Sequence, residues 1–297
     1  MKQETKAIVC AGVAVLSWST VASAFKIALM HLTPFGLLLV ASCTALLIFT
    51  CTITLQRKWP LVRALCVKQW KRFAWMGLLN PVIYYLVLFR AYNLLPAQIA
   101  QPLNYTWPIL LLVLLSLFSG QPIPRKKYAG MLLSLSGVAL ISFGSGGLNG
   151  QGISVTGVLL AFLSAFLWAA YWMFTNRNKK VDAIVALFAN FLFGSLYLLI
   201  AACVAGVDLS SLYGLLSGMY VGAFEISVPF VCFGLAIRNT NNPALINQMC
   251  YLSPFLSLFF IQTVLGEQIV LSTYIGLALI ISGIVFNESQ KHAVVSP

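Results

Sequence analysis

Long apolar runs separated by short polar segments dominate the pattern of this chain. Most runs reach the roughly 20 apolar residues that an α-helix needs to cross the hydrocarbon core of a bilayer. The pattern therefore predicts an all-α membrane protein. Ten transmembrane helices are expected, at residues 7–30, 33–55, 73–93, 96–118, 128–143, 157–175, 183–206, 212–237, 243–264 and 273–287.

The second half of the chain repeats the first at one fixed offset of 146 residues. The matched pairs are Pro108/Pro254, Leu112/Leu258, Gly120/Gly266, Ile123/Ile269, Tyr128/Tyr274, Gly130/Gly276, Leu133/Leu279, Ser136/Ser282 and Gly137/Gly283. A repeat with five spans enters the bilayer from opposite sides in its two copies, as in many secondary transporters. We therefore predict two inverted five-helix repeats, residues 1–145 and 146–297, around a central cavity.

Charge is scarce and unevenly distributed. Only 8% of the residues are charged, against about 25% in soluble domains, so lipid is the expected solvent. With the N-terminus inside, sixteen of the 18 basic residues face the cytoplasm: Lys2, Lys6, Arg57, Lys58, Arg63, Lys68, Lys71, Arg72, Arg125, Lys126, Lys127, Arg177, Lys179, Lys180, Arg238 and Lys291. The positive-inside rule explains this bias. The net charge of +12 thus reports topology and not nucleic-acid binding.

This bias predicts a multi-pass protein of the cell (inner) membrane with both termini in the cytoplasm. The longest inner segment, residues 56–72, is expected to be a loop with Trp59 and Trp70 near its ends. Tryptophan at the headgroup level is ordinary interfacial anchoring, and binding of a partner is the weaker alternative.

Prolines inside two expected spans mark equivalent positions of the repeats. Pro108 and Pro254 each remove a helical hydrogen bond, so kinks are expected in the fourth and ninth helices. Such breaks are tolerated at membrane depth only where protein or water satisfies the freed backbone groups. The kinks either shape a central cavity or bend the helices without touching a substrate.

Several short motifs carry a family resemblance over nearly the whole chain. Pro96-Ala97 and Pro243-Ala244 open helices four and nine, and Gly266-Glu267 follows helix nine. These features resemble the EamA family of the drug/metabolite transporter (DMT) superfamily. The more specific strings are similar to those of YddG-type amino-acid exporters: Trp18-Ser19-Thr20, Asn104-Tyr105-Thr106-Trp107-Pro108, Gly120-Gln121, Trp168-Ala169-Ala170-Tyr171 and Thr175-Asn176.

The resemblance implies ten helices in two inverted repeats and a central cavity that opens alternately to each side. It also implies export of small metabolites. One departure from the YddG-type pattern is Glu225 in the eighth helix. Because of this carboxylate, the substrate range of those exporters does not carry over directly.

Glu225 is the most informative ionisable residue, since it lies near the centre of the eighth expected span. A carboxylate there costs about 2.5 kcal/mol or more on insertion scales, and such residues usually face a cavity or a partner. Glu225 is therefore the candidate for binding a substrate ammonium group and for coupling transport to a proton. The alternative is a protonated side chain that joins two helices by a hydrogen bond.

Aromatic and amide side chains inside the spans supply further candidates. Buried Tyr and Trp need a hydrogen-bond partner, which makes them better cavity lining than filler against lipid. By resemblance, Tyr105, Trp107 and Trp168 line the cavity, and core packing is the alternative for each. The full set of candidate substrate-binding residues is Tyr84, Asn104, Tyr105, Trp107, Trp168, Tyr171, Glu225 and Gln248.

Two basic residues fall toward the outer side. Lys26 and Arg90 are candidates for capturing a substrate carboxylate at the outer mouth, or they reach the interface as ordinary snorkelling side chains. No Walker A string, zincin or nucleophile-elbow motif, or C-x-x-C pair occurs, so neither an enzyme nor a cofactor or metal site is expected.

These observations predict a secondary active transporter that moves small metabolites, with amino acids as the leading class, out of the cytoplasm by alternating access. The alternative is a transporter of cationic drugs or other small metabolites, because one acid with aromatic neighbours also suits a lipophilic cation. The expected partners are a small-molecule substrate and the lipid bilayer, and a self-contained pair of repeats predicts a functional monomer.

Overall fold

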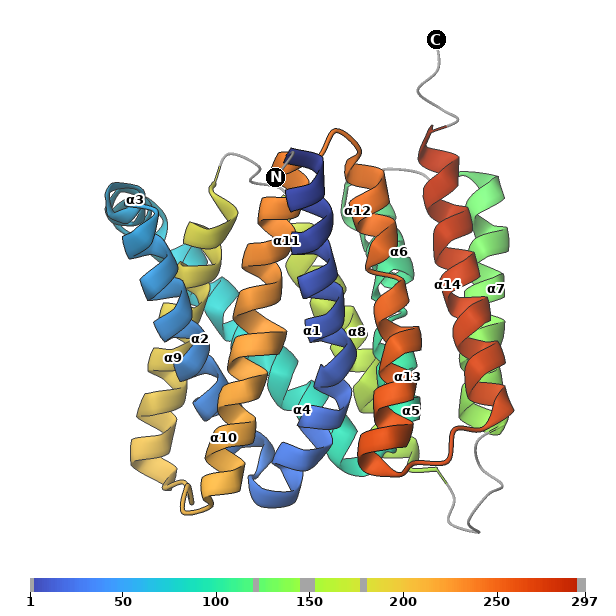
Figure 1. The fold of residues 1–297 in the computed structure, drawn as a ribbon, viewed down its shortest axis with the longest axis horizontal. Helices are drawn as coiled ribbons and strands as arrows, with labels where there is room; N and C mark the ends of the chain where they lie inside the picture. The colour runs from blue at the N-terminus through green and yellow to red at the C-terminus, as the bar shows by residue number, and fades with distance from the viewer. Residues whose placement is uncertain (1–2, 120–122, 145–152, 177–180, 293–297) are drawn as a thin grey trace. The chain divides into compact units, whose positions relative to one another are not determined.

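The computed structural model describes residues 3–119, 123–144, 153–176 and 181–292, and within them every regular element is a helix (Figure 1). This confirms the all-α prediction for the described residues. The elements, of which η1 and η2 are π-helical, are α1 (Gln3–His31), α2 (Pro34–Leu55), α3 (Trp59–Gly77), η1 (Leu78–Ile83), α4 (Tyr84–Leu94), α5 (Ala97–Asn104), α6 (Trp107–Ser119), α7 (Arg125–Gly144), α8 (Val155–Asn176), α9 (Ala183–Ala205), α10 (Leu212–Val221), η2 (Gly222–Ser227), α11 (Val228–Asn239), α12 (Pro243–Met249), α13 (Leu252–Leu265) and α14 (Leu271–His292).

Nine stretches of the described chain are long and apolar enough to cross a membrane: Gln3–His31, Pro34–Leu55, Lys68–Leu94, Ala97–Phe118, Val155–Thr175, Ala183–Ala205, Leu212–Asn239, Leu245–Leu265 and Leu271–Ser289. They coincide with nine of the ten expected helices. The fifth expected helix, residues 128–143, lies within α7, which is not one of the nine. A total of ten spans therefore stays a prediction. Lys2, Gly120, Gln121, Arg177, Lys179 and Lys180 lie outside the described residues.

The expected inner loop over residues 56–72 is wrong, because α3 already begins at Trp59. Pro60 fits the first turn of a helix, where its missing N–H costs nothing. The Lys and Arg residues that interrupt the apolar pattern are good helix formers, so they lower hydropathy without ending the helix. Only at Gln69 does the backbone leave helical values (φ −129°, ψ 20°).

The two prolines predicted to kink the fourth and ninth helices do interrupt them. α5 gives way to α6 just before Pro108, and α12 gives way to α13 just before Pro254. In each case the proline has no N–H for the carbonyl four residues earlier. The predicted pair of kinks is therefore confirmed.

The chain forms two compact units, and each takes segments from both halves of the sequence. The first unit comprises residues 1–89 and 178–260, and the second comprises residues 90–177 and 261–297. These units differ from the two predicted sequence repeats, residues 1–145 and 146–297, and the repeat boundaries stay a prediction.

In the first unit, α1 packs along α10 and α11, while α2 and α3 pack against α9 (Figure 1). Small residues permit the close contact of α3 with α9. A side chain at Gly77 would lie 2.5 Å from the carbonyl oxygen of Asn190 and 3.0 Å from the backbone nitrogen of Gly194. Backbones approach this closely in membrane proteins only where side chains are small.

A salt bridge ties the start of α9 to the start of α3. Lys58 Nζ lies 2.7 Å from Asp182 Oδ2, and the same carboxylate caps α9 by accepting from the amides of Ile184 and Val185. Burial alone would raise the pKa of Asp182, but the bond to Lys58 and the two amides hold that pKa below its ordinary value. Asp182 is therefore a charged N-cap whose two carboxylate oxygens both have partners in the protein.

In the second unit, α7 and α14 lie side by side along their lengths (Figure 1). Gly130 packs against the backbone of Gly283, and Gly137 packs against the backbone of Gly276. Because the order of these contacts reverses along the two helices, α7 and α14 are antiparallel. The four glycines are two repeat-related pairs, Gly130/Gly276 and Gly137/Gly283, and each glycine packs against the repeat counterpart of the other pair.

A carboxylate from a distant part of the sequence caps α5. The N-cap residue Pro96 makes no side-chain capping bond. Instead Glu267 accepts from the backbone amides of Ala97 (2.9 Å) and Gln98 (3.2 Å). By contrast, α12 is capped locally, since the side chain of Asn242 accepts from the amide three residues later. The Pro-Ala and Gly-Glu motifs therefore form one structural contact in the second unit.

Candidate functional site

The backbone around Glu225 departs from a regular α-helix. Glu225 lies in η2, and Pro229 follows four residues later. Because proline has no N–H, the carbonyl of Glu225 lacks its ordinary helical donor. Trp18 Nε1 donates to this carbonyl at 3.3 Å, and Ser227 Oγ donates to the carbonyl of Gly222 at 2.6 Å. Short π-helical segments of this kind are frequent at functional sites.

Glu225 as a residue is partly buried, and one phenol lies beside its carboxylate. Tyr85 Oη donates to Glu225 Oε1 at 3.3 Å. Tyr85 is 1% exposed and is fixed by ring contacts with Tyr84 (4.7 Å between centroids) and Phe89 (5.4 Å). No Lys, Arg or His among the described residues forms an ion pair with Glu225. The carboxylate therefore retains capacity to accept further hydrogen bonds.

The aromatic surroundings of Glu225 come from Trp18 in α1, Tyr85 in α4 and, beside Trp18, two rings of α11. The ring of Trp18 contacts Phe230 at 5.5 Å and Phe233 at 6.0 Å between centroids. We refer to Trp18, Tyr85 and Glu225 as the Glu225 cluster. A carboxylate with neighbouring aromatic faces can bind an ammonium group through charge and cation–π contacts, or it can take up and release a proton.

A second group of aromatic residues lies in the second unit, where α8 packs against α6. Trp107 and Trp172 are nearly parallel at 6.3 Å between centroids, and Trp168 and Tyr171 are nearly parallel at 5.5 Å. Trp168 also meets Trp172 edge-on at 6.0 Å. We call these four residues the aromatic cluster. The structure thus brings together three of the predicted candidates.

Trp172 was not among the candidates from the sequence. Its Nε1 is buried and has no hydrogen-bond partner among the described residues. Burying such a donor without an acceptor is costly, since buried Trp usually finds a partner. Trp172 follows Trp168 by four residues, which places both on one helical face. That spacing is the signal that could have identified it.

Asn104 joins two helices within the second unit. Its Nδ2 donates to Ser164 Oγ at 2.9 Å, and Ser164 Oγ in turn donates to the carbonyl of Ala161 at 2.7 Å. The amide nitrogen is therefore used in a bridge between α5 and α8. Its carbonyl oxygen Oδ1 remains the group that Asn104 can offer to a ligand.

The remaining candidates are distributed among different environments. Tyr84 is buried beside Tyr85, and Tyr105 and Lys26 are partly exposed. Gln248 and Arg90 are exposed, and no hydrogen bond or ion pair engages their side chains among the described residues. Neither Gln248 nor Arg90 is bonded to a cluster defined above. Within the described part of the chain, no group of three His, Cys, Asp or Glu side chains could hold a metal ion.

Comparison with known proteins places this architecture in a family. The model of the EamA-like transporter family matches residues 5–143 and 155–288. An uncharacterised transporter of Bacillus subtilis, YvbV, is 27% identical over 240 residues, which is 79% of this chain and 77% of that protein. The aromatic amino acid exporter YddG of Salmonella typhimurium is 40% identical over 83 residues, which is 26% of this chain and 28% of that protein.

A solved structure shares the fold along nearly the whole chain. One crystal structure, described only as that of a protein, has a TM-score of 0.68 at 21% sequence identity. The match covers 98% of this chain and 99% of the other chain. At this identity the likeness concerns the fold alone.

Proposed function

The chain belongs to the EamA-like transporter family, and we propose that it exports amino acids, aromatic ones among them, from the cytoplasm by alternating access. Members of this family are membrane transporters of small molecules and are not enzymes. This chain is accordingly a multi-pass membrane protein with a small-molecule substrate. The partial similarity to an aromatic amino acid exporter supports the choice of amino acids.

The observation that carries the proposal is the environment of Glu225. The carboxylate lies in an interrupted segment of the Leu212–Asn239 span, and Tyr85 is its one side-chain donor among the described residues. Holding an acid at that depth costs about 2.5–3.5 kcal/mol on insertion scales. In our proposal this cost is retained because Glu225 binds the substrate ammonium group and exchanges a proton during the cycle.

The aromatic cluster provides the second part of the proposal. Trp107, Trp168, Tyr171 and Trp172 offer ring faces on which an aromatic side chain can stack. The indole N–H of Trp172 is a donor for a carboxylate or carbonyl oxygen of the substrate. Asn104, Tyr105, Tyr84 and Gln248 stay candidates for substrate contact, and Lys26 and Arg90 stay candidates for the outer mouth.

Transport of cationic drugs or other small metabolites, in either direction, is the second candidate function. Trp18 donates a hydrogen bond to the backbone carbonyl of Glu225, and Tyr85 donates one to its carboxylate. No basic residue among the described residues forms an ion pair with this carboxylate. A lipophilic cation needs such a counter-charge and ring faces and no group for a substrate carboxylate.

We also propose the ten-span inverted repeat as the architecture of this transporter. The antiparallel contact of α7 and α14 supports it, because these helices carry equivalent repeat positions. The interruptions support it as well, since η1 begins at Leu78 and η2 begins 144 residues later, close to the repeat offset. Further parts of the proposal are location in the inner membrane, cytoplasmic termini and a monomeric working unit.

Counterflow of radiolabelled amino acids in proteoliposomes tests the proposal. The wild-type protein should exchange aromatic amino acids, with a rate that depends on pH. Glu225→Gln should abolish exchange or remove its pH dependence, because Gln keeps the shape of a protonated Glu but cannot ionise. Glu288→Gln is the matched control, because the carboxylate of Glu288 accepts no hydrogen bond among the described residues, and it should retain wild-type flux.

The possible outcomes separate the candidate functions. Wild-type flux with an unchanged pH profile in Glu225→Gln would refute the role of Glu225. Absence of flux across a broad amino-acid panel, together with flux of a cationic dye, would replace amino acids by cationic drugs as the substrate class.

A further inference from the structure

The first part of α3 lies across its neighbours in the first unit. Residues 59–68 form a helical segment that ends where the backbone breaks at Gln69. In Figure 1 the start of α3 is seen end-on, whereas α2 and α9 run lengthwise. This segment belongs to the side of the chain that the charge pattern predicts to be cytoplasmic. A short helix with this placement is positioned to lie along the surface of a membrane.

A shallow hollow separates this segment from the start of α9. Its volume is about 300 Å³. Five of the residues around it are apolar and three are polar. The lining residues are Leu61, Ala64, Leu65, Lys68, Gln69, Val181, Asp182 and Val185. The hollow therefore combines a surface for hydrocarbon with a positively charged edge, which is the chemistry of an amphiphile site.

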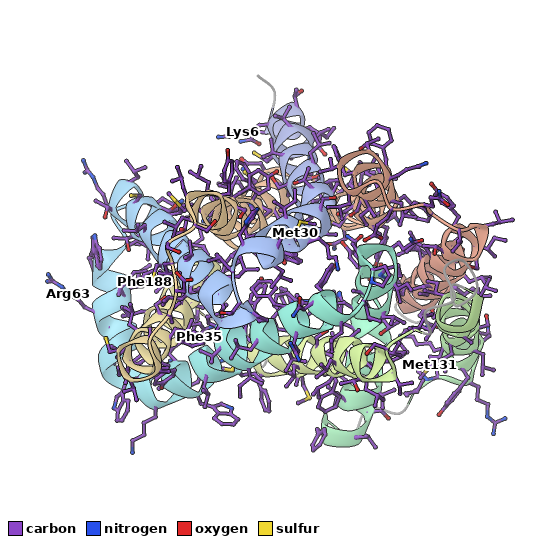
Figure 2. The ribbon with its side chains drawn as sticks, turned by 90° about the horizontal axis from the view of Figure 1, so that it is seen from below. Lys6, Met30, Phe35, Arg63, Met131 and Phe188 are labelled. Carbon is purple, nitrogen blue, oxygen red and sulfur yellow. The ribbon has the colours of Figure 1, made fainter. Side chains whose placement is uncertain are left out.

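The charge at the edge of the hollow is not neutralised by the protein. Asp182 is fully engaged by Lys58 and by the amides at the start of α9. Lys68, which lines the hollow, is exposed and forms no ion pair among the described residues. Arg63 and Lys71 lie outside the lining on the same helix and are likewise exposed without an ion pair, although Lys71 lies over the ring of Trp70. Figure 2 shows the side chain of Arg63 directed away from the ribbon. This edge therefore needs a negative partner from outside the chain.

Exposed apolar side chains beside these charges point to a membrane as the source of that partner. Trp59 is 37% exposed, Leu61 is 51% exposed and Trp70 is 51% exposed. Tryptophan is enriched at the headgroup level, and basic residues beside an apolar helix face attract anionic lipids. A soluble acidic protein would satisfy the charges but would leave these apolar faces in water.

We propose that the hollow between residues 59–68 and the start of α9 binds an anionic phospholipid. The phosphate lies against Lys68, and an acyl chain lies along Leu61, Ala64 and Leu65. Arg63 and Lys71 lie on the same helix outside the lining and add electrostatic attraction for an anionic headgroup. One basic contact at Lys68 and the attraction of Arg63 and Lys71 should raise the affinity for phosphatidylglycerol over phosphatidylcholine at least about tenfold. This site is separate from the Glu225 cluster and does not depend on the proposed transport function.

Thermal unfolding of the purified full-length protein in a neutral detergent tests the proposal. Titration with a short-chain phosphatidylglycerol should raise the Tm at concentrations about tenfold lower than titration with the matching phosphatidylcholine. In Arg63→Gln/Lys68→Gln/Lys71→Gln this preference should vanish. The control Arg125→Gln/Lys126→Gln/Arg238→Gln removes the same number of exposed positive charges elsewhere and should keep the preference.

Two further measurements test whether the lipid binds in the hollow and whether its acyl chain is needed. Ala64→Phe should weaken stabilisation by phosphatidylglycerol, since the larger side chain occupies the hollow. Glycerol 3-phosphate has the phosphate without an acyl chain and should leave the Tm unchanged at the same concentrations.

Several results would overturn the proposal. The first is an equal rise in Tm with phosphatidylglycerol and phosphatidylcholine, and the second is a preference for phosphatidylglycerol that persists in the triple variant. The others are wild-type stabilisation of Ala64→Phe by phosphatidylglycerol and a rise in Tm with glycerol 3-phosphate. Should the triple variant unfold without lipid, the single variants Arg63→Gln and Lys68→Gln replace it. Each should then lose part of the preference, and full retention in both would refute the site.

Discussion

Alanine in place of Gly276 tests whether the contact of α7 with α14 stabilises the second unit. The added methyl group would lie 2.5 Å from Ile141 Cγ1 and 2.7 Å from the carbonyl oxygen of Gly137. Ordinary contacts of this kind are about 3.5–4.0 Å. The two helices must therefore separate by roughly 1 Å, which also stretches the 2.9 Å hydrogen bond from Ser134 Oγ to the carbonyl of Ile280.

The expected magnitude follows from two opposing terms. Overpacking of a close contact costs about 1–3 kcal/mol, and alanine regains up to about 1 kcal/mol of helix propensity over glycine. We expect a net loss of about 1–2 kcal/mol. For a chain of this size, each kcal/mol lowers the Tm by roughly 2–4 °C. Thermal unfolding in detergent should therefore show a fall of roughly 2–8 °C.

Gly12→Ala is the matched control, because nothing lies within 4 Å of the position that its methyl group would take. Only the propensity term acts there, so its Tm should stay the same or rise. If Gly276→Ala unfolds at the same temperature as Gly12→Ala, the close contact contributes no stability and the reasoning fails.

Three further changes are expected to have measurable effects. The pKa of Asp182 is lowered in the folded state, so its stabilisation is fully present above about pH 4 and is lost as the pH falls through the folded value. The Tm difference between wild type and Asp182→Asn should thus be constant from pH 5 to pH 8 and shrink toward pH 3, and a difference that grows toward pH 3 would refute this. Glu267→Gln removes a charged cap from two amides and should cost about 1 kcal/mol in thermal unfolding; a Tm equal to wild type would contradict it. Trp18→Phe leaves the carbonyl of Glu225 without its indole donor and should cost about 1 kcal/mol, whereas Trp59→Phe loses only an exposed hydrogen bond and should be near neutral.

Local chemistry explains what the sequence could predict. The apolar runs define nearly all of the helices, because a span needs only length and hydropathy. The breaks before Pro108 and Pro254 follow from a missing N–H, which acts within one turn of its own helix. Trp107, Trp168 and Tyr171 were each named as candidates from the sequence, but their contact with one another was not predicted.

Other features could not be predicted, either because charged residues hide a helix in the hydropathy pattern or because a contact joins residues far apart in the sequence. The helix over residues 59–68 was missed because its basic residues lower the hydropathy while favouring the helix. The donor that meets the carbonyl of Glu225, which Pro229 leaves open, is the indole of Trp18, more than 200 residues away in the sequence. Trp172 was not among the predicted candidates, although its spacing of four residues from Trp168 places both rings on one face of α8.

The cap that Glu267 supplies to α5 has a consequence for the order of biosynthesis. The ribosome begins α5 170 residues before it reaches Glu267. Until then the first amides of α5 have no capping side chain, since Pro96 provides none. Gly130 and Gly137 of α7 likewise have no packing partner until α14 has been synthesised. Insertion of the last two helices is thus the event that completes the second unit, and a nascent chain released before residue 267 would leave it open.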